Sequence, residues 1–262
     1  MPAADDLDLL IDAARAAGDL ALTFDGTRAE RWDKPANEGP VTEADIAVNT
    51  LLEERLRGAR PGYGWLSEES PDTTERLEAE RVFVIDPIDG TRSFIDGSGS
   101  WAHSIALVEA GEVVAGVVYL PARAKLYAAV RGGGATLNGA PLRASAAATI
   151  EGAEVLATRP NMEPGLWPGG VPELKRSHRP SVAYRLALVA EGRFDGMLTF
   201  RDSWEWDIAA GAILVAEAGA RISDGQGHPL RFNNARPKLP GLIAAGAAVH
   251  ADLLRARGVP ER

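Results

Sequence analysis

The sequence predicts an α/β protein whose N-terminal half is of the α+β type. In residues 104–139, short apolar runs alternate with turns that contain glycine or asparagine, which is typical of an antiparallel β-meander. In residues 153–257, strand and helix patterns alternate, as they do in α/β units. The change of pattern near Ala144 predicts two domains, residues 1–143 and residues 144–262.

Two helices and a loop are expected before the first strand. Residues 5–24 carry leucine, isoleucine and alanine at helical spacing. Residues 25–40 are polar and contain glycine and proline, so they predict a mobile loop of a size that is often functional. Thr42 begins the second helix, which extends to about Arg57, and Thr42 and Asp45 have a spacing like that of a capping box.

The central strand of the first half is expected at residues 82–85, where β-branched and aromatic residues are dense. Pro87 has no amide hydrogen and cannot continue a central strand, so we expect the strand to end at Asp86. The other strands expected in this half are residues 64–66, 104–109, 113–120 and 125–130.

The second half is expected to begin with a strand at residues 153–157. A proline-rich segment, residues 159–180, follows it and predicts a long irregular excursion. The later elements are expected to be a helix at 181–191, a strand at 194–199, a helix at 206–219, a strand at 241–245 and a helix at 249–257.

Composition excludes several classes of function. The chain of 262 residues has 37 acidic and 28 basic residues, a net charge of −9, which argues against a partner that is a nucleic acid polymer or an anionic membrane. It has no cysteine, so disulfides and thiolate metal sites are excluded. The acidic N-terminus does not resemble a secretory signal, and no apolar run approaches the roughly 20 residues that span a bilayer. We therefore expect a cytoplasmic protein.

The segment after the central strand carries the chemistry. Asp86 and Asp89 lie three residues apart at the strand end, and Gly90 gives the backbone the freedom for a close approach. The amides of Gly90 and Thr91 follow, where a helical turn can begin. Such a place can hold a hard cation and a phosphate together.

Three motifs in order carry a family resemblance. They are S-E-E-S at residues 67–70, D-P-I-D-G-T at residues 86–91 and W-D-I-A-A-G at residues 206–211. The chain resembles the metal-dependent phosphatases of the inositol monophosphatase superfamily over residues 5–255. The resemblance implies a layered αβαβα sandwich, as in inositol monophosphatases and sugar phosphatases. It also implies a homodimer and inhibition by Li⁺.

The same resemblance implies the metal ligands. Glu68, Asp86 and the carbonyl of Ile88 would hold one Mg²⁺, and Asp86, Asp89 and Asp207 would hold a second. A third, weaker ion would bind beside Glu68. Converging carboxylates repel one another by about 4 kcal/mol per pair at about 4 Å, so they must take up protons or cations. Ligation by oxygen alone favours Mg²⁺ or Mn²⁺ over zinc.

The expected chemistry is direct phosphoryl transfer to water, without a phospho-enzyme. One ion would lower the pKa of the attacking water and the other would stabilise the leaving oxygen. The resemblance implies that Thr91 and Glu68 orient the water, that Asp45 holds Thr91, and that Gly90 and Thr91 receive the phosphoryl oxygens. Asp89 and Asp207 would also contact the substrate.

Asp45, Asp207 and Lys34 each have more than one interpretation. Asp45 equally fits a helix-capping role. Asp207 in a first helical turn would also favour the helix dipole, which does not exclude ligation. Lys34 is either a solvated loop lysine or, by the resemblance, part of a loop that closes over the metals.

Substrate choice is expected to depend on residues 177–206. Here the chain is similar to bacterial 3′(2′),5′-bisphosphate nucleotidases, which carry a lysine where this chain has Arg185. Arg185 could neutralise a second phosphate, or it could be a solvated helix residue. Inositol monophosphatases often have a glutamate where this chain has Phe200, and Phe200 could lie against a base or in the core.

The sequence therefore predicts a Mg²⁺-dependent phosphomonoesterase whose partner is a small phosphorylated metabolite. We favour a nucleoside bisphosphate such as 3′-phosphoadenosine 5′-phosphate. The alternatives are an inositol-1-phosphate or broad sugar-phosphate phosphatase, a histidinol-phosphate phosphatase, and a binding module that has lost catalysis.

Overall fold

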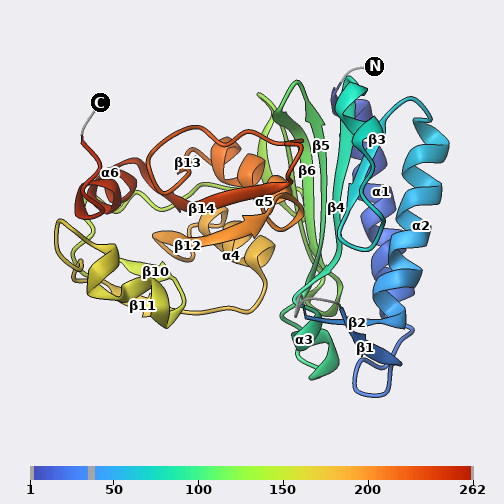
Figure 1. The fold of residues 1–262 in the computed structure, drawn as a ribbon, viewed down its shortest axis with the longest axis horizontal. Helices are drawn as coiled ribbons and strands as arrows, with labels where there is room; N and C mark the ends of the chain where they lie inside the picture. The colour runs from blue at the N-terminus through green and yellow to red at the C-terminus, as the bar shows by residue number, and fades with distance from the viewer. Residues whose placement is uncertain (1–2, 35–38, 261–262) are drawn as a thin grey trace.

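The elements of the protein stack in five layers (Figure 1). The computed structural model describes residues 3–34 and 39–260. Helices α1 and α2 cover one face of a seven-stranded sheet, α4 and α5 lie between this sheet and a five-stranded one, and α6 covers the outer face of the second sheet. The αβαβα sandwich is thus confirmed. The helices are α1 (Ala3–Ala21), α2 (Glu43–Ala59), α3 (Thr91–Ile95), α4 (Val182–Ala190), α5 (Glu205–Glu217) and α6 (Ala247–Ala256).

The seven-stranded sheet contains the predicted meander. Its strands follow chain order, with β3 and β4 parallel and every later neighbour antiparallel. They are β3 (Gly64–Ser67), β4 (Arg81–Asp89), β5 (Ala102–Glu109), β6 (Glu112–Leu120), β7 (Lys125–Val130), β8 (Gly134–Leu137) and β9 (Ala140–Pro141).

Strand β4 does not end where the sequence predicted. It continues past Asp86 and Pro87 to Asp89, which pairs with Ala102 of β5. The register shifts between Asp86 and Asp89, so the missing amide hydrogen of Pro87 falls in an irregular part of the ladder. The prediction of an end at Asp86 was wrong because a bulge, and not only a strand end, can accommodate a proline.

The five-stranded sheet is mixed and has the order β11-β10-β12-β14-β13. Strand β10 is parallel to β11 and β12, whereas β14 is antiparallel to β12 and β13. The sequence missed β11 and β13 and ended β12 too early. The strands are β10 (Glu154–Leu156), β11 (Lys175–Ser177), β12 (Gly196–Trp204), β13 (Arg221–Ser223) and β14 (Lys238–Ala245).

The predicted loop 25–40 is partly a β-hairpin. Strand β1 (Arg31–Asp33) pairs antiparallel with β2 (Pro40–Thr42), which leads directly into α2. Residues 35–38 of the predicted loop lie outside the described residues. The pairing places Lys34, the residue after β1, beside the seven-stranded sheet, where it meets acids of the next segment.

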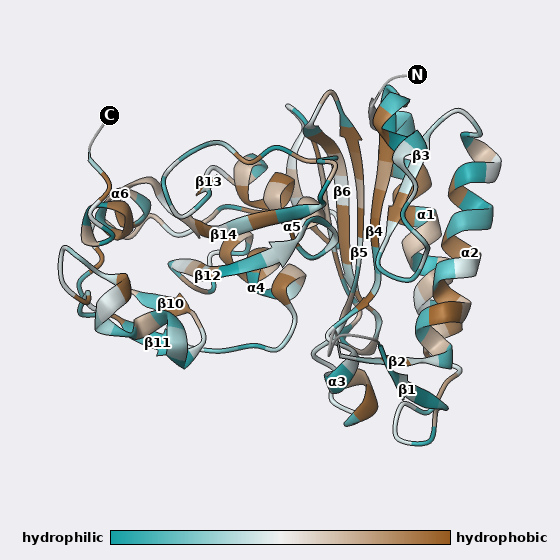
Figure 2. Ribbon diagram, in the orientation of Figure 1, coloured by the Kyte–Doolittle hydropathy of each residue, from teal (hydrophilic) through white to brown (hydrophobic). Residues whose placement is uncertain are grey.

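Both faces of the seven-stranded sheet are buried. Phe83 and Ile85 of β4 pack with α1 and α2, while Val82 and Val84 pack with α4 and α5, as alternation along a strand requires. Figure 2 shows the apolar residues concentrated along β4, β5 and β6, whereas β1 is hydrophilic. None of the described helices is both long and apolar enough to cross a membrane.

Candidate active site

Three carboxylates from two distant segments meet between the sheets. Asp86 and Asp89 come from the irregular end of β4, and Asp207 comes from the first turn of α5. Each offers an oxygen within 4.8 Å of the others. Asp86 is only 2% exposed and Asp89 only 7%. The structure therefore brings together the acids of the second and third motifs.

Hydrogen bonds hold Asp86 and Asp89 in place. Asp86 Oδ1 accepts from the Ile88 amide at 3.0 Å. Asp89 Oδ2 accepts from Ser181 Oγ and from the Ala183 amide, both at 2.6 Å, which leaves Oδ1 of Asp89 for another partner. The sequence indicates residue 181 only as the start of a helix. In the structure Ser181 caps α4 and also links it to Asp89.

The buried carboxyl groups of the cluster cannot all ionise without strong mutual repulsion. Burial is the main cause that raises the pKa of Asp86, with the charges of Glu68, Asp89 and Asp207 adding to it. Burial and the charge of Asp89 likewise raise the pKa of Asp207. Burial raises the pKa of Asp89 to about 6, although its bonds to Ser181 and Ala183 oppose the change. Protons or cations must therefore balance the cluster at neutral pH.

Glu68 lies beside the cluster and is held by Lys34. The Nζ atom of Lys34 lies 2.7 Å from Glu68 Oε1 and 2.5 Å from Glu69 Oε1. The Lys34 side chain is only 13% exposed, so its interpretation as a solvated loop lysine was wrong. Burial lowers the pKa of Lys34, but the two glutamates outweigh this effect and raise its pKa overall.

Asp45 has both of the arrangements that the sequence left open. Its Oδ2 accepts from the amide and hydroxyl of Thr42 at 2.9 and 2.6 Å, which completes a capping box at the start of α2. Its Oδ1 accepts from Thr91 Oγ1 at 3.2 Å. The Thr91 hydroxyl also lies 3.1 Å from the Ile88 carbonyl. Burial raises the pKa of Asp45 to about 6.

Gly90 makes the turn after β4 possible. Its φ of 95° lies in the left-handed region, and an added Cβ would lie 3.3 Å from the carbonyl oxygen of Ser100. A residue with a side chain would be strained here in both respects. The turn sends the chain directly from Asp89 into α3, so that Thr91 faces Asp45.

Two buried residues that the sequence did not indicate as part of the site stabilise it through hydrogen bonds to the backbone. His103 Nδ1 donates to the Pro87 carbonyl at 2.5 Å, and burial lowers the His103 pKa to about 4, so the ring is neutral. Ser104, the cross-strand partner of Asp86, donates to the Trp206 carbonyl at 2.7 Å. These bonds fix the turn that carries Asp86 and the helix that carries Asp207.

Arg185 is buried, and the interpretation of it as a solvated helix residue was wrong. It is 5% exposed, and it donates through Nε to the Arg179 carbonyl at 2.5 Å and through Nη2 to the Pro180 carbonyl at 3.0 Å. Burial lowers its pKa, and its charge interacts with Asp89 and with Arg201 of β12. Arg185 therefore braces the loop before α4 and adds positive charge beside the acids.

Phe200 belongs to the core of the second half. Its ring meets Trp167 edge-on with centroids 5.2 Å apart, and the guanidinium of Arg257 lies over it at 4.2 Å. The possibility that Phe200 stacks on a base is therefore not supported. Nearer the acids, Trp204 and Trp206 stack with centroids 4.5 Å apart.

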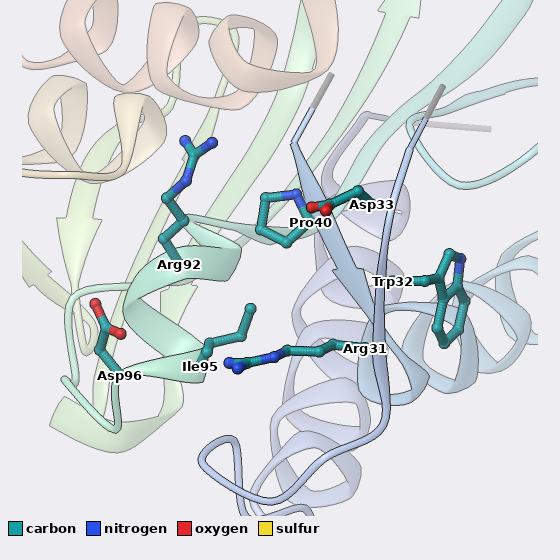
Figure 3. Close-up of a pocket in the computed structure, with 7 residues that line it drawn as sticks. All are labelled: Arg31, Trp32, Asp33, Pro40, Arg92, Ile95 and Asp96. Atoms are coloured by element: carbon teal, nitrogen blue, oxygen red, sulfur yellow. The ribbon is translucent and has the colours of Figure 1, made fainter. Parts of the chain in front are cut away.

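A separate groove of about 450 Å³ lies between the β1–β2 hairpin and α3. Figure 3 shows Arg92 of α3 and Asp96, the residue after α3, on one side of the groove and Arg31 and Pro40 on the other, with Trp32 projecting from the other side of β1. None of the clustered acids lines this groove. Its two arginines and two aspartates cancel in charge, so it offers an anion no net attraction and we do not place the substrate there.

The donor set of the cluster fits a hard divalent cation. Among residues 3–34 and 39–260, Asp86, Asp89 and Asp207 form the only group of three or more acidic, histidine or cysteine side chains close enough to share one ion. All their donor atoms are carboxylate oxygens, which suit Mg²⁺, Mn²⁺ or Ca²⁺ better than zinc. The raised pKa values show that the folded protein holds these charges together at a cost that a cation would offset.

Comparison with known proteins agrees with this geometry. The model of the inositol monophosphatase family matches residues 5–257. An inositol-1-monophosphatase of Rhizobium meliloti is 34% identical over 95% of this chain and 94% of its own. A 3′-phosphoadenosine 5′-phosphate phosphatase of Mycobacterium leprae is 36% identical over 95% and 92%. The 3′(2′),5′-bisphosphate nucleotidase CysQ of Escherichia coli is 33% identical over 86% and 93%.

Solved structures show the same fold. An IMPase of Thermotoga maritima superposes with a TM-score of 0.83 at 29% identity and covers 97% of each chain. The suhB protein of Bartonella henselae gives a TM-score of 0.81 at 30% identity, over 97% of this chain and 98% of its own. The chain therefore belongs to the inositol monophosphatase family and is a phosphoric monoester hydrolase.

Proposed function

We propose that the protein is a Mg²⁺-dependent phosphatase of a small, doubly phosphorylated nucleoside, with water as the phosphoryl acceptor. The observation that carries the metal part of the proposal is the meeting of Asp86, Asp89 and Asp207 within 4.8 Å. The substrate part depends on the basic side chains around Arg185.

Two or three metal ions would bind at the cluster. We assign Glu68, Asp86 and the Ile88 carbonyl to one Mg²⁺, Asp86, Asp89 and Asp207 to a second, and the outer side of Glu68 to a third, with Mn²⁺ able to substitute. When bound, the ions activate water and stabilise the leaving oxygen. The bulge in β4 supports this assignment because it carries Asp86, Ile88 and Asp89 within one turn of the chain.

Thr91 and Asp45 would orient the attacking water. The Thr91 hydroxyl has one proton and two possible acceptors, Asp45 Oδ1 and the Ile88 carbonyl. If the Ile88 carbonyl binds a metal ion, the hydroxyl would donate to Asp45, and its oxygen would then be able to accept a hydrogen bond from the water. Glu68 would accept a hydrogen bond from the same water. The amides of Gly90 and Thr91 would receive the phosphoryl oxygens.

The second phosphate of the substrate would bind to the basic side of the site. Burial lowers the pKa of His178, and the charges of Arg185, Arg176 and Arg179 lower it further, so all three arginines lie near this ring. Arg201 of β12 in turn interacts with Arg185. This concentration of positive charge in a protein of net charge −9 supports a dianionic group here. Arg185 would act mainly by bracing the loop, since two of its nitrogens already bind carbonyl oxygens.

An inositol-1-phosphate phosphatase is the second candidate. The relative from Rhizobium meliloti is named an inositol-1-monophosphatase. Its identity to this chain is similar to that of the relatives named for nucleotide substrates. Inositol-1-phosphate has a single phosphate and would leave these basic side chains without a second phosphate to bind. We retain the predictions of a cytoplasmic location and of a homodimer; size-exclusion chromatography with light scattering can test the homodimer.

The test is phosphate release in the presence of Mg²⁺ from four substrates: 3′-phosphoadenosine 5′-phosphate, inositol-1-phosphate, a sugar phosphate and histidinol phosphate. We expect the bisphosphate to have the highest kcat/KM. If inositol-1-phosphate exceeds it, the substrate assignment is wrong, although the metal site stands. If no ester is hydrolysed with Mg²⁺ or Mn²⁺, the metal assignment also fails.

A matched pair of variants tests the second phosphate. Arg201→Ala removes an exposed guanidinium next to Arg185, and Arg193→Ala removes an exposed guanidinium after the far end of α4. Because a hydrogen bond to a charged group contributes about 1.5–3 kcal/mol, we expect R201A to lower kcat/KM for the bisphosphate roughly 10- to 100-fold. R193A should change it less than about twofold. Equal effects of the two variants would exclude the assignment of Arg201.

A further inference from the structure

A buried polar network ties the first turn of α5 to a loop far along the chain. Glu205 is fully buried, and its carboxylate accepts three hydrogen bonds. The Asn233 amide donates to Oε2 at 2.6 Å, and the amide and Nδ2 of Asn234 donate to Oε1 at 3.0 and 2.6 Å. Asn233 has a φ of 62°, a left-handed conformation that asparagine tolerates better than most residues.

The same loop is held from its other side by Arg76. Arg76 is 3% exposed and donates to Asn233 Oδ1 at 2.6 Å and to the Asn234 carbonyl at 2.9 Å. Its guanidinium also makes a two-bond salt bridge to Asp72 at 2.6 and 2.9 Å. Arg76, Asn233, Asn234 and Glu205 form a continuous chain of hydrogen bonds, the Glu205 network.

The Glu205 network connects the segments that carry the clustered acids. Arg76 lies in the short helical turn between β3 and β4, after Glu68 and before Asp86. Glu205 lies two residues before Asp207 in the first turn of α5. Ser104 fixes the backbone of α5 at one point, the Trp206 carbonyl. A second anchor at Glu205 restrains how the helix turns about that point, and so the direction in which Asp207 projects.

We propose that Glu205 is a positioning residue for the metal site, acting through Asn233, Asn234 and Arg76 to hold Asp207 toward Asp86 and Asp89. The proposal rests on the proposed function, because it supposes that Asp207 is a metal ligand. A buried carboxylate is costly unless every oxygen is satisfied, and here three donors satisfy it. Because these bonds hold the Glu205 side chain, they also restrain the first turn of α5.

Glu205→Gln tests the role with little change of volume. Glutamine replaces one carboxylate oxygen with an NH₂ group, which cannot accept from the amide of Asn233 or Asn234. The matched control is Glu217→Gln at the other end of α5. Glu217 also accepts two backbone bonds, from Gly132 and Gly134 at 2.8 Å, but it lies about 15 Å along the helix from Asp207.

The primary measurement is Mn²⁺ binding to the full-length protein by isothermal titration calorimetry, without substrate, beside the thermal stability of each variant. Partners that orient metal ligands commonly contribute 10- to 100-fold to affinity, so we expect E205Q to bind Mn²⁺ at least about 10-fold more weakly than wild type. E217Q should bind within about twofold of wild type, whatever its loss of stability. Asn234→Ala, which keeps the backbone donors, should show a smaller loss in the same direction.

The binding measurements distinguish failure of the positioning role of Glu205 from failure of the proposed function. Wild-type affinity in both E205Q and N234A would overturn the positioning role and leave the metal site intact. A loss in E217Q equal to that in E205Q would also overturn it, because it would reflect a general weakening of α5. If wild type itself binds no Mn²⁺ or Mg²⁺, the proposed function fails, and the inference fails with it. If E205Q does not fold, N234A alone decides between the first two outcomes.

Discussion

Replacing Asp86 with asparagine should make the metal-free protein more stable while it abolishes activity. The asparagine side chain would keep the oxygen that accepts from the Ile88 amide, and its NH₂ group would donate toward the neighbouring carboxylates. The substitution would remove one charge from a group whose oxygens lie within 4.8 Å of one another. The variant thus separates the structural cost of the cluster from its function.

The magnitude follows from the geometry. Two unit charges at this separation repel by about 3 kcal/mol at an effective dielectric constant near 20, and Asp86 faces both Asp89 and Asp207. Bound protons already relieve part of this repulsion in wild type, because burial raises the pKa of all three acids. We therefore expect a gain of about 2 kcal/mol, or about 4–8 °C in Tm for a chain of this size.

The gain should depend on pH in a definite direction. Since the pKa of Asp89 rises from 3.8 to about 6 and those of Asp86 and Asp207 also rise, the folded protein binds more protons than the unfolded chain above about pH 4. The wild type keeps this stability at low pH and loses it as pH rises through the folded pKa values. The advantage of D86N should therefore be largest near about pH 8 and small near about pH 5.

The assay is thermal unfolding in EDTA and in Mg²⁺, with Asp6→Asn as the control. Asp6 is equally buried, but it is paired with Arg60 and Arg81 at 2.9 and 3.0 Å, so its loss should destabilise the protein. Mg²⁺ at about 100 times its Kd should stabilise wild type by about 2.7 kcal/mol and D86N far less. If D86N is no more stable than wild type in EDTA near about pH 8, the carboxylates do not repel one another as described.

Three further variants test individual residues. Asp89→Asn should lower kcat at least about 100-fold while the circular dichroism spectrum is retained, and unchanged kcat would remove Asp89 from the site. Lys34→Met should tighten the weakest Mg²⁺ site in a titration, because an ion beside Glu68 would no longer displace an ammonium group; weaker binding would contradict this reasoning. Thr91→Val should lower kcat about 100-fold with little change in KM, whereas a change confined to KM would assign Thr91 to substrate binding alone. Li⁺ should inhibit phosphate release at saturating Mg²⁺, and a lithium-insensitive enzyme would contradict the expectation drawn from the family resemblance.

The acids of the site could be predicted because each lies in a short motif. Asp86 and Asp89 share one turn, and Asp207 follows a tryptophan at the start of a helix, so two stretches of sequence sufficed. The sequence also predicted the meander, since alternating apolar runs and turn residues are local signals. The division into domains at residues 143 and 144 stays a prediction.

The supporting residues could not be predicted, because their partners are distant in the chain. Ser104 binds the carbonyl of Trp206, and His103 binds Pro87 from a neighbouring strand. Glu205 precedes the third motif directly, but nothing in its neighbours indicates that residues 233 and 234 will enclose it. Strand β1 was missed because a strand of three exposed residues has no apolar alternation to detect.

Asp86, Asp89 and Asp207 are proposed to hold divalent cations together, and anomalous scattering from crystals grown with Mn²⁺ would locate such ions. We expect at least two anomalous peaks, one among Asp86, Asp89 and Asp207 and one between Asp86 and Glu68, each about 2.0–2.4 Å from carboxylate oxygens. Bound Mn²⁺ with no peak at these carboxylates would show that they do not form the metal site.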